Sequence, residues 1–266
     1  MMYLSVEDLY MEVHHHPKVE KKNFKEYFLE FLMIFLAVTM GFFAESLREH
    51  IADKVKEKEY VNSLISDLDK DIKVINDQMT NFETGLAQLD SLITMLKDPR
   101  VKEFGADIYY FGRQAAKPAV RFLINDRTLQ QMKNSGDFRL IRNDKASSAI
   151  IEYYRNLNVI ENLRTLDNNL QNEYRRIAID IFDPIVLETY INLENMENLE
   201  DSSSSERPAG NPALLTYDTK QLTRLAGMVA YTRGTRHAYV SFEKTMRKKA
   251  QKLIELLKRE YHLNLK

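Results

Sequence analysis

Three groups of residues in this sequence carry side chains that could do chemistry, and the first is a run of three histidines. His14, His15 and His16 lie side by side, and imidazole is a common ligand of zinc, nickel and copper. Adjacent positions in an irregular leader rarely converge on one ion, however, and the chain has no Cys to complete a site. We therefore expect a solvated leader that binds no metal.

The second group consists of arginines that accumulate between residues 113 and 142. Guanidinium groups form paired hydrogen bonds with carboxylate or phosphate, so this group could bind an acidic ligand or the end of a peptide. The alternative is that the arginines pair on the surface with Asp126, Asp137 and Asp144. With the neighbouring asparagine and glycine, the candidate site comprises Arg113, Arg121, Arg127, Asn134, Gly136, Arg139 and Arg142.

The third candidate is Glu30, a single carboxyl group within an apolar stretch. A carboxyl inside a membrane helix can relay protons. Glu30 lies in the first turn of the stretch, however, where its side chain can reach the interface. We therefore expect an interfacial residue, with a proton carrier as the alternative.

Enzymatic function finds no support in the sequence. It contains no GxSxG, HExxH, phosphate-binding loop or dinucleotide fingerprint. The many acidic residues fall on helical segments, where we expect them to form solvated faces. The formal net charge of −1 gives no general attraction for nucleic acid. We expect a protein that is not an enzyme and uses no cofactor.

These candidates must be positioned by long helices, because the chain contains only 8 Gly and 6 Pro in 266 residues. The most apolar helix is expected at residues 24–46, after a flexible leader at 1–23. Residues 27–44 would span ~27 Å at 1.5 Å per residue, which is close to the hydrocarbon thickness of a bilayer. The sequence thus predicts a transmembrane helix, and a buried core helix is the alternative.

The flanks of this segment favour an inner-membrane protein with a cytoplasmic N-terminus and a periplasmic bundle. Four lysines precede the segment and four basic residues follow it within a short distance, so the positive-inside count is even. A short basic N-terminus normally stays inside. Ala37 and Gly41 form a pair of small residues that would let two such helices approach closely, in line with a homo-oligomer.

After the membrane segment we expect a soluble bundle at residues 47–266. The heptad stripe of its first helix indicates one helix that continues from the membrane to Asp98-Pro99. Such a stripe suits either a coiled coil between chains or a seam within one chain, and we favour the second. The stripe consists of Val61, Ile65, Leu68, Ile72, Ile75, Met79, Phe82, Leu86, Leu89, Ile93 and Leu96.

Two further amphipathic stripes complete the predicted fold. One runs from Ile150 to Ile181, with Asp144 as its N-cap and Asp183-Pro184 as its end. The other begins near Leu222 and continues to Tyr261. Three helices that each have one apolar face bury those faces together. The sequence predicts an all-α fold, with a transmembrane helix that leads into an elongated antiparallel bundle.

Two segments interrupt the long helices. Residues 99–143 are expected to form a compact insertion, with a short helix at 126–134 that ends at Gly136 and an extended apolar piece from Phe138 to Ile141. Residues 199–214 are rich in Ser, Pro and Gly and are expected to form a mobile surface loop.

Several stretches resemble a Bacteroidetes-type family of membrane-anchored proteins of unknown function. They are EFLMIFLAVTMGFFAESLREH, EKEYVNSLISDLDKDI and LQQMKNSGDFRLIRND, the last followed by IIEYY. The leader MEVHHHPKVEKK is similar as well, and it suggests Met11 as the natural start. The resemblance implies an N-terminal anchor and a helical soluble domain, and it implies no activity.

Two functions remain compatible with these features. The first is a membrane-tethered scaffold or accessory subunit of a cell-envelope assembly, which contacts membrane lipid and protein partners. The second is a sensory or regulatory bundle that binds a small acidic ligand or peptide. No second membrane span follows the bundle, so a sensor would need a partner to pass its signal on.

Overall fold

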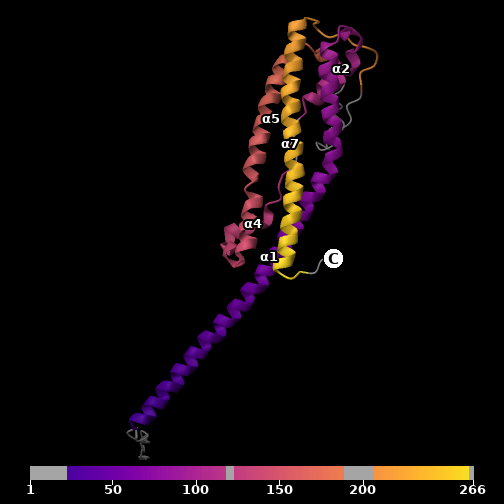
Figure 1. The fold of residues 1–266 in the computed structure, drawn as a ribbon. Coiled ribbons are helices and arrows are strands. Elements are labelled where there is room, and N and C mark those ends of the chain that lie inside the picture. Colours follow the sequence, from indigo (N-terminus) through magenta and orange to yellow (C-terminus); the bar gives the residue numbers. More distant parts are fainter. Residues whose placement is uncertain (1–22, 118–122, 189–206, 264–266) are drawn as a thin grey trace, which may run out of the picture. The chain divides into compact units, whose positions relative to one another are not determined.

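The computed structural model describes residues 23–117, 123–188 and 207–263, without the side chains of residues 80 and 81. Every regular element in these ranges is a helix (Figure 1), which confirms the predicted all-α fold. The elements are α1 (Phe24–Lys97), the short 3-10 helix η1 (Val101–Glu103), α2 (Gly105–Ala115), α3 (Arg127–Ser135), the 3-10 helix η2 (Asp137–Leu140), α4 (Asp144–Tyr154), α5 (Leu157–Ala178), α6 (Pro184–Glu188) and α7 (Thr219–Glu260).

The chain divides into two compact units, Met1–Lys54 and Val55–Lys266, and α1 belongs to both. This helix is 74 residues long and ends at Lys97, two residues before Pro99, as predicted. Proline lacks the backbone N–H that would continue the helical ladder. In the first unit the described residues form only this helix. The leader at 1–22, with its three histidines and Met11, lies outside the described residues.

The heptad stripe of α1 is part of the core of the second unit. In the series of every seventh residue, Val61, Leu68, Ile75, Leu89 and Leu96 are buried and Phe82 is half-buried. The alternate positions of the stripe are buried or half-buried. These side chains pack against helices of the same chain, so the stripe forms a seam within one chain.

The core is divided into two apolar clusters along α1. The first cluster combines residues 60–75 of α1 with α3, α4, the start of α5 and the second half of α7. The second cluster combines residues 89–96 of α1 with α2, the end of α5 and the first half of α7. The long helices α1, α5 and α7 therefore contribute to both clusters, and the short helices contribute to one.

Four side-chain contacts fix the register of α7 against α1. Arg233 forms an ion pair with Asp90, and Lys244 lies 3.6 Å from Glu83. The remaining contacts are a 2.9 Å hydrogen bond from Arg247 to Asn76 and one of 2.6 Å from Tyr261 to Glu57. Residue numbers rise along α7 while those of the partners fall along α1.

The second predicted helix is wrong in its continuity and in its end: the structure divides it into α4 and α5, and α5 ends at Ala178, before the predicted stop at Asp183-Pro184. The break lies at Arg155 and Asn156, where the sequence has neither Gly nor Pro. The amide of Asn156 donates hydrogen bonds to the carbonyls of Glu152 and Tyr153, which satisfies the end of α4. The predicted N-cap is also one residue off: Asn143 accepts the hydrogen bond from the N–H of Ala146. The third predicted helix is confirmed as the single helix α7.

In its described residues, the insertion at 99–143 contains the predicted short helix and three helical elements that were not predicted, η1, α2 and η2. The short helix is confirmed as α3, and Gly136 follows it with a φ of 73°, a left-handed conformation that glycine adopts at little cost. The predicted extended piece is wrong, because Phe138 lies in η2. Helix α2 was not predicted, although Pro118 follows its last residue, Ala115, by three positions. Of the predicted loop, residues 199–206 lie outside the described residues, and residues 207–214 are non-helical with Leu214 buried.

Candidate functional site

The apolar part of α1 is exposed over its whole length. Large side chains such as Phe31, Ile34 and Phe42 are more than half exposed. The helix contains one window that is long and apolar enough to cross a membrane, and none of that window is buried. Thr39 donates its hydroxyl to the carbonyl of Phe35, four residues earlier, so this polar group is satisfied within the helix. The described helix thus presents an unpacked apolar surface, with Glu30 partly exposed near its start.

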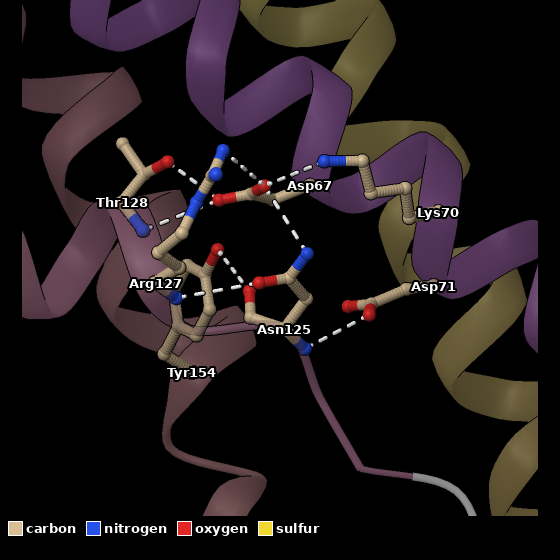
Figure 2. A network of polar contacts seen from close by, with 7 residues as sticks. All are labelled: Asp67, Lys70, Asp71, Asn125, Arg127, Thr128 and Tyr154. Carbon is tan, nitrogen blue, oxygen red and sulfur yellow. Dashed lines mark hydrogen bonds and ion pairs between the residues drawn. The ribbon is translucent and has the colours of Figure 1, made fainter.

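A second feature is a polar network in which Asp67 of α1 holds the segment that leads into α3 (Figure 2). The carboxylate of Asp67 is fully buried. It accepts hydrogen bonds from the backbone N–H and the hydroxyl of Thr128, at 3.2 and 2.5 Å. The amide of Asn125 donates a third bond at 3.1 Å, and Arg127 and Lys70 approach one oxygen at 3.4 and 3.6 Å. Several donors therefore offset the cost of burying this charge.

One turn along α1, Asp71 binds the same segment and α4. It accepts the backbone N–H of Asn125 at 2.9 Å and the hydroxyl of Tyr153 at 2.7 Å. Burial raises the pKa of Asp71 to about 6, although the two hydrogen bonds oppose this shift. Burial also raises the pKa of the Tyr153 and Tyr154 hydroxyls well above the ordinary value, so both remain donors at neutral pH. Tyr154 donates to the carbonyl of Asn125.

A third acidic group, Asp137, follows the end of α3 and binds α1. Its carboxylate accepts the hydroxyls of Tyr60 and Ser135, each at 2.6 Å, and lies 2.8 Å from the ammonium of Lys56. These partners, Lys56 first, hold the pKa of Asp137 well below its ordinary value. This carboxylate is therefore ionised at neutral pH and fastens the start of η2 to α1.

Together these contacts form what we call the acidic lock: Asp67, Asp71 and Asp137 with their donors. The N–H of Arg142 extends it by donating to Glu57 at 3.0 Å. The lock joins residues 56–71 of α1 to residues 125–137 and to Tyr153 of α4. Carboxylates engaged by donors of their own chain are typical of structural roles. The lock holds the insertion on α1.

Buried acids contradict the prediction that the acidic residues form solvated faces. A signal was present in the sequence: Tyr60, Leu64, Asp67 and Asp71 are spaced by four, three and four residues, which is a second stripe beside the heptad stripe. A carboxylate in such a stripe can be buried only if donors meet it, and those donors lie more than fifty positions away.

The arginine candidates are not brought together by the structure. Arg113 lies on α2 beside the second cluster, whereas the other described candidates lie on α3, at its end, on η2 and after it, beside the first cluster. Arg127 pairs with Asp67, not with Asp126. Asn134, Gly136, Arg139 and Arg142 are exposed, and Arg121 lies outside the described residues.

A separate group of buried polar residues, which we call the polar layer, follows α5 and α7 from the gap between the two apolar clusters into the first cluster, where Tyr239 and Met246 flank Glu243. Its members are at most 7% exposed and come from α5 and α7. Arg236 donates to the carbonyls of Ala115 and Lys117 at the end of α2, at 3.1 and 2.6 Å. Within the described part of the chain, neither amide atom of Gln171 has a hydrogen-bond partner. The layer consists of Asp167, Gln171, Thr232, Arg236 and Glu243.

Among the described residues, no group of three or more His, Cys, Asp or Glu side chains could hold a metal ion. Comparison with known proteins gave no further guidance: no family model, curated protein or solved structure matches the chain.

Proposed function

We propose that the chain is a non-enzymatic, membrane-tethered interaction protein that serves as a scaffold or accessory subunit of a cell-envelope assembly. The observation that carries this proposal is α1. Its exposed apolar segment is continuous in one helix with residues that form the core of a helical bundle. Lipid would cover the apolar segment, and the bundle would present its surface to protein partners or to a second copy.

The separation of the arginine candidates favours a scaffold over the alternative of a sensor for a small acidic ligand. A pocket for a carboxylate or phosphate needs several guanidinium groups within reach of one anion. Arg113 lies beside a different cluster from Arg127, and Arg127 is engaged by the buried Asp67. The hydrogen-bond donors of the acidic lock are bonded to carboxylates of the same chain. Such an arrangement suits a rigid spacer.

Membrane anchoring is tested by extraction with alkaline carbonate. We expect the full chain to stay in the membrane pellet. A variant with Phe35→Arg and Val38→Arg should move to the supernatant, because each arginine at mid-membrane costs about 3 kcal/mol. Ile51→Arg, seven residues beyond the apolar run, is the matched control and should stay in the pellet. Release of the unmodified chain by carbonate would refute the anchor.

Orientation is tested with single cysteines, since the chain has none of its own. We propose that the N-terminus is cytoplasmic and the bundle periplasmic. Cysteine at the exposed position Asn168 should react with a maleimide that crosses the outer but not the inner membrane, and cysteine at Glu26 should react only after lysis. The reverse pattern would show the opposite orientation.

Partners are tested by crosslinking in intact cells, followed by purification in a mild detergent. A scaffold should yield defined adducts that persist when Arg113 is changed to Ala. A sensor that uses this arginine should lose its ligand-dependent adduct. An exclusively monomeric chain after crosslinking would contradict the scaffold proposal.

A further inference from the structure

The heptad stripe of α1 continues toward the N-terminus, beyond the part that packs in the bundle. The same alternation of three and four residues leads from Val61 back through Lys58 and Lys54 to a series of uncharged positions. We call these positions the N-terminal seam: Ile51, Leu47, Ala44, Met40, Ala37 and Met33. All of them lie in the first unit and along one face of α1, because the helix is unbroken there.

The part of the N-terminal seam that follows the apolar run is exposed in the single chain. Leu47 and Ile51 are 51% and 55% exposed. The ion pair that fastens α1 to Asp137 lies further along the helix, at Lys56. Ile51 lies seven residues after Ala44, the last residue of the apolar run, which places it ~10 Å beyond the run at 1.5 Å per residue. Lipid that covers the run therefore leaves Ile51 in water.

The residue types along the N-terminal seam change where the apolar run ends. Within the run the seam contains Ala37 and Ala44, with Gly41 beside them. Small residues let two backbones approach closely, which favours helix association in lipid. Beyond the run the seam contains Leu47 and Ile51, whose burial is favourable because they leave water. Each part of the seam thus has the residue type that favours helix association in its own surroundings.

The charges along the stripe limit the length over which two such helices could pair. The N-terminal seam carries no charge from Met33 to Ile51, and the next two positions of the stripe are the exposed Lys54 and Lys58. In a parallel pair of helices, like ammonium groups would face each other at both lysines. A pair would therefore end after Ile51, and from Val61 onward each chain buries the stripe in its own core.

We propose that the N-terminal seam packs against the same seam of a second copy, in parallel and in register over residues 33–51. This inference rests on the proposed membrane anchor, which holds two copies in the same direction and at the same depth. At equal depth the small residues of the two copies meet in lipid, and Leu47 and Ile51 meet their counterparts in water. The face is therefore complementary to itself, as a two-fold interface requires. A charged partner would find no charge on the seam to bind.

Disulfide formation between single cysteines tests this arrangement in membranes that contain the full chain, which has no Cys of its own. Leu47→Cys and Ile51→Cys should form a disulfide-linked dimer about tenfold faster than Glu49→Cys, because a disulfide requires closely spaced Cβ atoms. Glu49 lies on the opposite face of the same turn of α1. All three positions are exposed and lie outside the two apolar clusters, so the bundle should fold in each variant.

The strength of the pair is measured by energy transfer between donor-labelled and acceptor-labelled full chains in lipid vesicles. Ile51→Arg should raise the apparent dissociation constant about tenfold or more, because two guanidinium groups would face each other. Glu49→Arg places the same residue on the opposite face and should change the constant by less than about twofold. Lys54→Leu should lower the constant about tenfold, since it removes a pair of like charges and lengthens the seam. An unchanged constant for both Ile51→Arg and Lys54→Leu would overturn the proposal.

Extraction with alkaline carbonate separates a failure of the pair from a failure of the anchor. Leu47 and Ile51 lie beyond the apolar run, so their variants should stay in the membrane pellet. Release of the unmodified chain would refute the anchor and, with it, the equal depth of two copies. Equal dimer formation at Leu47, Ile51 and Glu49 in a chain that stays in the pellet would refute the pair alone. A crosslink from Leu47→Cys to a different protein, without a dimer, would also refute the second copy.

Discussion

Asp67 and Thr128 are 61 positions apart in the chain and share two hydrogen bonds, one to the backbone N–H and one to the hydroxyl of Thr128. Both residues are buried. This pair explains how the insertion, which has few long elements of its own, is held in one place on α1. The first prediction concerns this contact.

Asp67→Ala should lower the free energy of unfolding by about 3 kcal/mol, because it leaves the buried N–H and hydroxyl of Thr128 without acceptors. Thermal unfolding followed by circular dichroism would measure this loss. Asp69→Ala changes an exposed acid two residues away and should have an effect below about 0.5 kcal/mol. Equal effects of the two substitutions would mean that the lock contributes little.

Gly112→Ala should destabilise the bundle by about 1–3 kcal/mol through overpacking. A Cβ atom there would lie 2.5 Å from Cζ of Phe182 and 3.2 Å from the hydroxyl oxygen of Tyr174. Gly227→Ala is the control on α7, where a Cβ meets no described atom within 4 Å. That change should stabilise the chain by up to about 1 kcal/mol, since alanine favours helix. Urea unfolding should show that the two substitutions change the free energy of unfolding in opposite directions. A change in the same direction would contradict the close packing of Phe182 against α2.

The pH dependence of the stability that Asp137 contributes should be opposite to that of Asp71, because the pKa of Asp137 is lowered and that of Asp71 is raised. The folded pKa of Asp137 lies below the ordinary value of 3.8, so its ionised form stabilises the fold above that pH and the contribution is lost as pH falls. Asp137→Asn should therefore lower the urea midpoint at pH 7, and the difference from the unmodified chain should shrink at pH 3. Asp144→Asn, an exposed change, is the comparison. A difference that stays constant down to pH 3 would argue against a stabilising ionised Asp137.

Leu68→Asp tests whether the heptad stripe forms the core within one chain. Leu68 is fully buried, and a charge there without a partner should cost about 3–5 kcal/mol. Val74→Asp, at a position of α1 that is 40% exposed, should be tolerated. An unchanged melting temperature for Leu68→Asp would show that this part of α1 does not belong to the core.

Chemical crosslinking tests the order of contacts between α1 and α7. Tyr261 contacts Glu57, so Lys258 should react with Lys56 or Lys58 and not with Lys97. Lys252 lies between the contacts of Arg247 with Asn76 and of Tyr261 with Glu57, so it should react with lysines within residues 57–76 and not within 80–97. Lys220, at the start of α7 beside the second cluster, should instead react with Lys97. A crosslink between Lys258 and Lys97 would show that α7 runs along α1 in the opposite direction.

The sequence by itself determined the long helices and most of their ends. The heptad spacing from Val61 to Leu96, the proline at 99 and the glycine at 136 act on the nearest turns of backbone, so they predict α1 and the end of α3 without any tertiary information. The stripe from Leu222 to Tyr261 predicts α7 in the same way.

Only the tertiary structure decided which polar residues are buried and where the second stripe breaks. Asp67, Asp71 and Glu243 look like the exposed acids beside them, because burial depends on donors and apolar surfaces from distant segments. The sequence also did not predict the division between α4 and α5. The side chain of Asn156 satisfies the end of α4, but an asparagine at this position is equally compatible with one uninterrupted helix. Periodicity is a local property of the chain, whereas the desolvation of a carboxylate is fixed by every group that packs around it.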